Sequence, residues 1–319
     1  MTSWSITLPF NPMATPRPSF TVRNGGVITY YKTEYSAYLS AIQSYITSQG
    51  MYNTDFEKVV NSKYGVVANI IFYLGIPSSV KNVTKLTYTS KPDIDNLVKA
   101  LLDGVFNSLK IKDSRVVGIK AVKLKTSSNP RTEVTLTGLN DLADEKTDKV
   151  TSKVSKVLTD TDSNPTWEAV FPFAPVSTPR PAITFTKVGT GSDGKPKYQK
   201  HTYNSTKYEK YLGSMKEYLQ EHELDNDELQ EVVNVEYGVI AKVNFFCKVP
   251  SNQKTLRKLL KTTAPDIDNL LKAVLDGIFN NLSADDSRVV GVQALKFNEI
   301  EEPRTEIRLT GLTRSPDGQ

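Results

Sequence analysis

The chain has 319 residues, of which 24% are charged and 38% are hydrophobic, and its formal net charge at pH 7 is +5. This composition is typical of a globular protein, and no apolar run approaches the roughly 18 residues that a membrane-spanning helix needs. The first residues, 1–6, show no signal-peptide pattern, so we expect a cytoplasmic protein without a membrane segment.

The chain has few cysteine and histidine residues, which limits the kinds of metal site that it can form. Cys247 is the single cysteine, and His201 and His222 are the two histidines, so an internal disulfide and a cysteine-based zinc site are excluded. Any bound metal ion must be held by carboxylates, which favours a hard cation, Mg²⁺ or Mn²⁺.

Positive charge is concentrated in the first part of the chain. Residues 1–139 carry 16 Lys and Arg against 8 Asp and Glu, whereas residues 165–319 carry 20 against 21. A basic half suits a polyanionic partner, although a lysine-rich surface serves solubility equally well.

From the amino end, each half of the chain begins with an alternating segment and a proline-rich turn. Residues 3–8 and 167–171 are the expected first strands. In the first half an amphipathic helix follows, with Tyr35, Tyr38, Ile42, Tyr45 and Ile46 on one face. Further strands are expected at residues 64–73, 115–124, 133–137 and 237–247. Strands and helices thus alternate, which predicts an α+β (mixed α/β) fold built on a mixed sheet.

The best-defined helix begins at an acidic motif. Apolar residues recur at i, i+3, i+4 and i+7 from Ile94 to Leu109, a stripe that must pack on a core. The other side carries Asp95, Lys99 and Asp103 at intervals of four residues, so these groups share one face.

The chain is a tandem repeat. Residues 92–123 match residues 265–296 at 22 of 32 positions. We predict two homologous domains, residues 1–139 and 165–319, joined by a linker of residues 140–164. The linker is long enough for the domains to pack against each other as an intramolecular pseudo-dimer.

Identity between the copies is concentrated on aspartates, which are Asp93, Asp95 and Asp113 in the first and Asp266, Asp268 and Asp286 in the second. Carboxylates around magnesium ions supply what phosphodiester hydrolysis needs, and Lys99 and Lys272 offer a compact charge for the phosphate. In one copy alone, the first aspartates could equally cap the helix or form surface ion pairs. That interpretation does not explain why the third aspartate recurs at the same distance.

The order Asp-x-Asp-Asn-Leu-x-Lys, a short helix and Asp-Ser-Arg-Val, after a Pro-Arg-Pro turn, resembles the RusA family of Holliday junction resolvases across both repeats. The resemblance implies two RusA-like domains, each with a mixed sheet flanked by helices. It also implies a magnesium-dependent endonuclease that acts as a dimer on four-way DNA junctions. The family's catalytic, metal-binding aspartates correspond to Asp93, Asp95, Asp113, Asp266, Asp268 and Asp286, and its helix lysine corresponds to Lys99 and Lys272.

This chain departs from the family pattern in two ways. It holds two copies, so we expect a monomer in which one polypeptide does the work of a dimer. The second repeat has Asp285 before Asp286, whereas the first has Lys112 before Asp113. Either the metal site of the first repeat is weaker, or the extra acid is dispensable.

The length of the motif helix leaves the grouping of the aspartates open. Residues 95–107 span about 18 Å at about 1.5 Å per residue. Six extended residues can just return Asp113 to Asp93. Otherwise Asp113 joins Asp266 and Asp268, and the sites are composites of the two repeats.

Basic residues near the motifs are expected to contact DNA. A predicted basic helical face carries Lys254, Arg257, Lys258 and Lys261, at i, i+3, i+4 and i+7. The other candidates are Lys81, Lys85, Arg17 and Arg180. For each of them, a solvated surface charge is the alternative.

A glycine pattern, Gly189, Gly191 and Gly194, lies in an insertion of the second repeat without a βαβ context, so it predicts a hairpin tip and no dinucleotide site. No P-loop occurs either, and we expect no nucleotide cofactor. The predicted function is resolution of Holliday junctions and branched DNA by paired incision. A non-catalytic or half-active branched-DNA-binding protein is the alternative.

Overall fold

The computed structural model describes residues 2–23, 26–77, 86–106, 109, 111–140, 164–180, 182–190, 196–250, 252, 255–256 and 258–314. The predicted linker lies outside these residues except for its ends, Asn140 and Asn164. Four predicted DNA contacts also lie outside them: Lys81, Lys85, Lys254 and Arg257.

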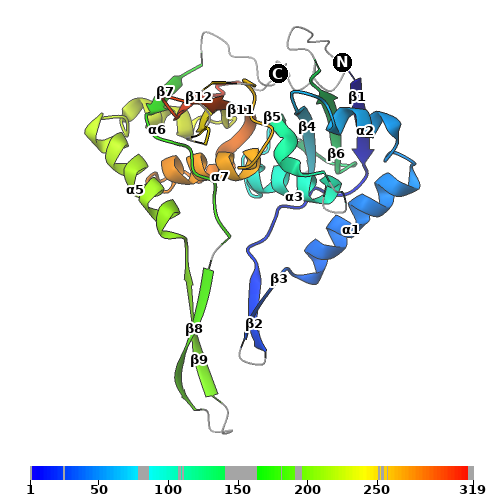
Figure 1. Ribbon diagram of the computed structural model, residues 1–319. Coiled ribbons are helices and arrows are strands. Elements are labelled where there is room, and N and C mark those ends of the chain that lie inside the picture. The colour runs from blue at the N-terminus through cyan, green and yellow to red at the C-terminus, as the bar shows by residue number, and fades with distance from the viewer. Residues whose placement is uncertain are drawn as a thin grey trace.

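One eight-stranded sheet runs through both repeats, in the order β1-β6-β4-β5-β11-β10-β12-β7 (Figure 1). The strands of the first repeat are β1 (Thr2–Leu8), β4 (Val66–Gly75), β5 (Val116–Thr126) and β6 (Arg131–Gly138). Those of the second are β7 (Thr166–Phe171), β10 (Val239–Lys248), β11 (Val289–Glu299) and β12 (Arg304–Gly311). In each half one pair is parallel, β4 with β5 and β10 with β11, and the others are antiparallel.

The two halves of the sheet meet at a seam, where β5 pairs antiparallel with β11. Gly118 lies opposite Leu295, and Val122 lies opposite Gly291. The start of each seam strand therefore lies near the end of the other.

Helices accompany each half of the sheet. They are α1 (Thr33–Ser48), α2 (Thr54–Val60) and α3 (Ile94–Phe106) in the first repeat, and α5 (Thr206–Glu221), α6 (Asp227–Asn234) and α7 (Ile267–Phe279) in the second. Short 3₁₀ turns, η1 (Asp113–Arg115) and η2 (Asp286–Arg288), lead into β5 and β11. The prediction of an α+β fold with a mixed sheet is confirmed.

The motif helices α3 and α7 lie side by side over the seam (Figure 1). The predicted apolar stripe of α3 is buried from Ile94 to Phe106, and burial of each large side chain contributes about 1.5–3 kcal/mol. Gly104 allows α1 to approach closely, because a Cβ there would stand 2.6 Å from the Ile42 Cδ1. This packing holds the acidic ends of α3 and α7 at the centre of the molecule.

Two hairpins project from the helical side of the molecule (Figure 1). They are β2 (Ser19–Arg23) with β3 (Gly26–Tyr30), and the longer β8 (Ala182–Thr190) with β9 (Pro196–Tyr203). The predicted hairpin of the second repeat is thus present, while residues 191–195 at its end lie outside the described part. Each helix among the described residues is too short or too polar to span a lipid bilayer.

Candidate active site

The first acidic motif occupies the start of α3. Asp93 precedes the helix, and its main-chain carbonyl accepts a hydrogen bond of 3.1 Å from the Leu97 amide. Asp95, in the first turn, is 2% exposed. In the second repeat Asp266 is the N-cap residue of α7, yet its side chain makes no capping hydrogen bond. Helix capping therefore does not account for Asp266.

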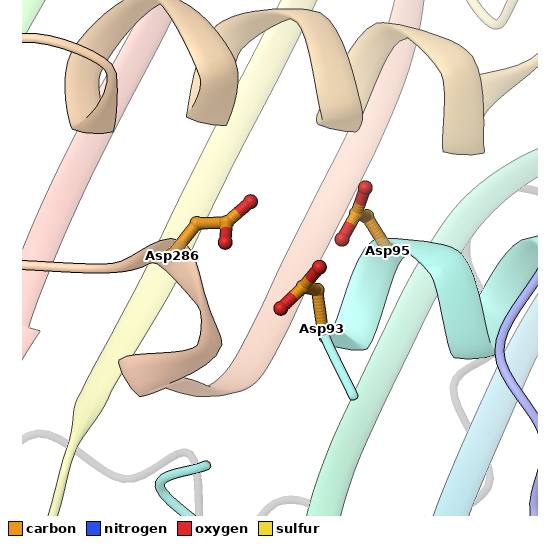
Figure 2. Close-up of side chains that lie close together, drawn as sticks. All are labelled: Asp93, Asp95 and Asp286. Carbon is orange, nitrogen blue, oxygen red and sulfur yellow. The ribbon is translucent and has the colours of Figure 1, made fainter. Parts of the chain in front are cut away.

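The third carboxylate comes from the other repeat. Asp93, Asp95 and Asp286 point toward one another (Figure 2), and one oxygen of each lies within 4.8 Å of the others. We call this triad site 1. Asp93 and Asp95, at the start of α3, belong to the first repeat and Asp286 belongs to η2 of the second, so site 1 is composite.

Site 2 consists of Asp113, Asp266 and Asp268. The negative charges of Asp266 and Asp268 act on Asp113, so the same exchange between repeats operates here. In the described part of the chain, only site 1 gathers its oxygens within 4.8 Å. A triad of Asp93, Asp95 and Asp113 within one repeat is therefore not the arrangement found.

The seam explains the exchange of the third aspartate. The Pro92 carbonyl, next to Asp93, accepts a hydrogen bond from Lys123 near the end of β5, whereas Asp113 precedes the start of that strand. From Val116 to Lys123 the strand rises roughly 23 Å at about 3.3 Å per residue. Antiparallel pairing instead places the start of β11, and Asp286 just before it, near the end of β5.

The motif lysines are exchanged in the same way. Lys272 of α7 lies 3.2 Å from the Asp95 Oδ2, and Lys99 of α3 lies 3.2 Å from the Asp268 Oδ2. Lys272 therefore belongs with site 1 and Lys99 with site 2. The alternative of a surface ion pair between Asp95 and Lys99 along α3 is not found. Each of these residues instead forms an ion pair with a residue of the facing helix.

In each repeat a tyrosine hydroxyl donates to a second acid on the same helix as the motif lysine. Lys272 also lies 3.3 Å from the Asp276 Oδ1, and the Tyr208 hydroxyl donates to the other oxygen of Asp276 at 2.7 Å. In the first repeat the Tyr35 hydroxyl donates to Asp103 at 3.3 Å. The sequence pattern predicts Tyr35 on the buried face of a helix but not this hydrogen bond, because periodicity shows burial and not where a hydroxyl points.

Burial and the crowding of carboxylates raise the pKa values of several site residues. Burial, followed by the charges of Asp93 and Asp95, raises the pKa of Asp286 to about 7. Burial and the charges of Asp266 and Asp268 raise the pKa of Asp113 to about 6. Burial also raises the pKa of Asp95, although Lys272 opposes that shift. A divalent cation would relieve the repulsion responsible for part of these shifts.

Some carboxylate oxygens have no partner in the described part of the chain. They are the Oδ1 atoms of Asp93, Asp95 and Asp268, all buried. An unpaired buried acceptor is costly, and hard divalent cations bind carboxylate oxygens. The residues of both sites therefore fit such an ion.

Both sites open on one cleft of about 1640 Å³. Carboxylates from both sites line it, as do Lys99, Lys272 and the exposed residues Arg17 and Arg180. The cleft therefore brings together carboxylates from both sites and arginines from the two proline-rich turns.

The predicted basic helical face is absent from the residues described. Residues 255–256 and 258–262 are not helical, and Leu260 forms an isolated β-bridge with Phe297. Lys261 is 7% exposed, and the Lys258 ammonium donates to the Lys63 carbonyl at 3.0 Å. The helical spacing was misleading, because this segment runs along the end of β11 in an extended form.

Comparisons with known proteins agree with the tandem arrangement. The chain matches the family described as "Endodeoxyribonuclease RusA" twice, over residues 9–137 and 172–310. It is also similar to "Uncharacterized protein YqaN" of Bacillus subtilis (strain 168), with 32% identity over 132 residues. That alignment covers 39% of this chain and 87% of YqaN, and its length is close to that of one repeat.

Proposed function

Because the chain belongs to the RusA family of endodeoxyribonucleases, we propose that it resolves Holliday junctions and other branched DNA by paired, metal-dependent phosphodiester incision. The observation that supports this most strongly is the pair of composite triads, each with a lysine from the facing helix, that open on one cleft. A resolvase needs two cutting centres at a fixed separation, and one sheet through both repeats would hold sites 1 and 2 at such a separation.

In site 1, Asp93, Asp95 and Asp286 would hold Mg²⁺ or Mn²⁺, and Asp113, Asp266 and Asp268 would do so in site 2. When bound, such an ion neutralises charge on the phosphate and favours deprotonation of water. The Lys272 ammonium, 27% exposed and 3.2 Å from Asp95, would contact a phosphate oxygen in site 1. Its contact with Asp276 keeps it directed into the cleft.

Arg17 and Arg180 are proposed to bind DNA phosphates at the cleft. Lys81, Lys85, Lys254, Arg257 and Lys258 stay in the proposal as further phosphate contacts. We further propose that the protein is a cytoplasmic monomer and uses no nucleotide cofactor. Its two domains would comprise residues 1–139 and 165–319.

A half-active enzyme is the second candidate, and the difference between the sites favours it. Site 1 gathers closely and has Asp285 beside Asp286, whereas Asp113 of site 2 follows Lys112. Site 2 would then bind an ion more weakly.

The test uses a four-way junction labelled on one strand at a time, with Mg²⁺, Mn²⁺ or EDTA. We expect binding in EDTA and incision of two opposed strands with metal. The Asp95→Asn/Asp268→Asn double variant should bind without cutting. Incision of one strand alone would support the half-active candidate, and binding without incision by the wild type would contradict the proposed enzyme.

A further inference from the structure

Two lysines of the seam strands are completely buried. Lys123 on β5 and Lys296 on β11 are each 0% exposed, although lysine is among the residues least often buried. A buried ammonium is costly unless its N–H groups find acceptors. Neither lysine belongs to the acidic motif or to the cleft.

The contacts of Lys123 join the two repeats. Its ammonium donates to the main-chain carbonyls of Ser90 and Pro92, both at 3.0 Å, and to that of Ser287 at 2.5 Å. These three acceptors match the three N–H groups of an ammonium. Pro92 directly precedes Asp93 and Ser287 directly follows Asp286, so one side chain holds both segments that supply site 1.

Lys296 repeats this arrangement at site 2. Its ammonium donates to the carbonyls of Thr263 at 3.2 Å, Pro265 at 2.9 Å and Ser114 at 2.7 Å. Pro265 precedes Asp266, and Ser114 follows Asp113. Each lysine therefore contacts one segment from each repeat.

We propose that Lys123 and Lys296 are positioning residues, each of which fixes the two segments that bring carboxylates to one composite site. The effect of this on a bound ion rests on the proposed function. Charge supports the assignment, because Asp93, Asp286 and Asp95 all act on the Lys123 ammonium. The lysine thus offsets part of the charge of the triad while it fixes the main chain beneath it.

The first test is hydrogen exchange of the full-length, metal-free chain. Lys123→Met leaves three carbonyls without their donor. Exchange should accelerate about tenfold in residues 90–97 and 285–289, as expected for a loss near 1.4 kcal/mol. Residues 113–116 and 263–270 should not change, and Lys296→Met should reverse the pattern.

Lys120→Met is the matched control, because Lys120 is half-buried on the same strand and, by alternation, lies on the other face of the sheet. It should leave all four segments unchanged. Unchanged exchange in Lys123→Met, or an equal increase throughout the chain, would overturn the proposal. If Lys123→Met does not fold, Lys123→Gln, whose amide keeps two donors, takes its place. If neither variant folds, the lysine has a folding role and the proposal is wrong.

The second test is Mn²⁺ binding followed by electron paramagnetic resonance. We expect Lys123→Met to lower the affinity for one bound Mn²⁺ ion about 10- to 100-fold and to leave the affinity for the other ion unchanged. Equal weakening of both ions, or no weakening, would count against the proposal. If the wild type binds no Mn²⁺, the proposed metal-dependent function is wrong, and hydrogen exchange still decides the role of the lysines.

Discussion

Asp95 shows how one residue combines burial, charge and an unpaired oxygen. It is 2% exposed, its Oδ2 pairs with Lys272, and its Oδ1 has no partner among the described residues. A buried carboxylate in this setting lowers the stability of the fold, so its presence points to a role other than stabilisation. Metal binding is the purpose that fits its neighbours.

Asp95→Asn should inactivate site 1 while the protein stays folded. The amide keeps the size of the side chain but removes the charge that a divalent ion needs, so incision of one strand should fall about 100-fold or more. Asp268→Asn should do the same to the opposed strand. Strand-specific labels and thermal unfolding check both effects. Paired incision by Asp95→Asn at the wild-type rate would remove site 1 from catalysis.

The raised pKa values predict the pH dependence of the metal-free protein. Folded Asp286 and Asp113 keep protons up to about pH 7 and 6, whereas an unfolded chain releases them near pH 4. The folded state binds more protons in this range, so the free energy of unfolding falls as pH rises from about 4 to 7. Chemical denaturation in EDTA measures this slope.

Asp286→Asn is the control for this slope and should make it shallower, while the titration of Asp113 remains. Mg²⁺ should stabilise the wild type more at pH 7.5 than at pH 5.5, because its ligands must be deprotonated. An identical slope in the wild type and in Asp286→Asn would contradict the assignment of this titration to Asp286.

Among the elements, α3 and η2 supply one site together, although they belong to different repeats. The double variant Asp95→Asn/Asp286→Asn therefore damages site 1 twice and should still incise one strand through site 2. Asp95→Asn/Asp113→Asn, with both changes in the first repeat, should incise neither strand. Junction assays with separate strand labels distinguish the two. The reverse result would mean that each repeat carries its own site.

The exchange between α3 and α7 makes a further prediction for the lysines. Lys272→Met should impair the strand that Asp95→Asn impairs, and Lys99→Met should impair the other, because each lysine pairs with the facing helix. Single-turnover incision of each labelled strand measures this. If Lys99→Met impaired the same strand as Asp95→Asn, the ion pairs across the helices would have no role in catalysis.

For the whole molecule, the seam between β5 and β11 joins the repeats within one chain. A family member with a single copy needs a second chain to form such a seam, whereas this chain has both halves. We expect a monomer near 35.5 kDa by light scattering at micromolar concentration, with or without Mg²⁺. A stable species of twice that mass would show that another surface also associates.

The sequence by itself determined the duplication, the mixed sheet and the residues of both triads. Periodicity predicts which side of α3 is buried, since the apolar stripe from Ile94 to Phe106 depends only on the 3.6-residue turn. Identity between copies likewise singled out the aspartates and the motif lysines. These are local properties of the chain, readable without knowing what packs on what.

Only the tertiary structure decided which aspartates meet. Antiparallel pairing of β5 with β11 places Asp286 near Asp93 and separates Asp113 from it by most of a strand. The same pairing buries Lys123 against Ser287, and extended packing beside β11 buries Lys261 where helical spacing predicted exposure. Such contacts depend on register and direction between segments distant in sequence, which no local pattern encodes.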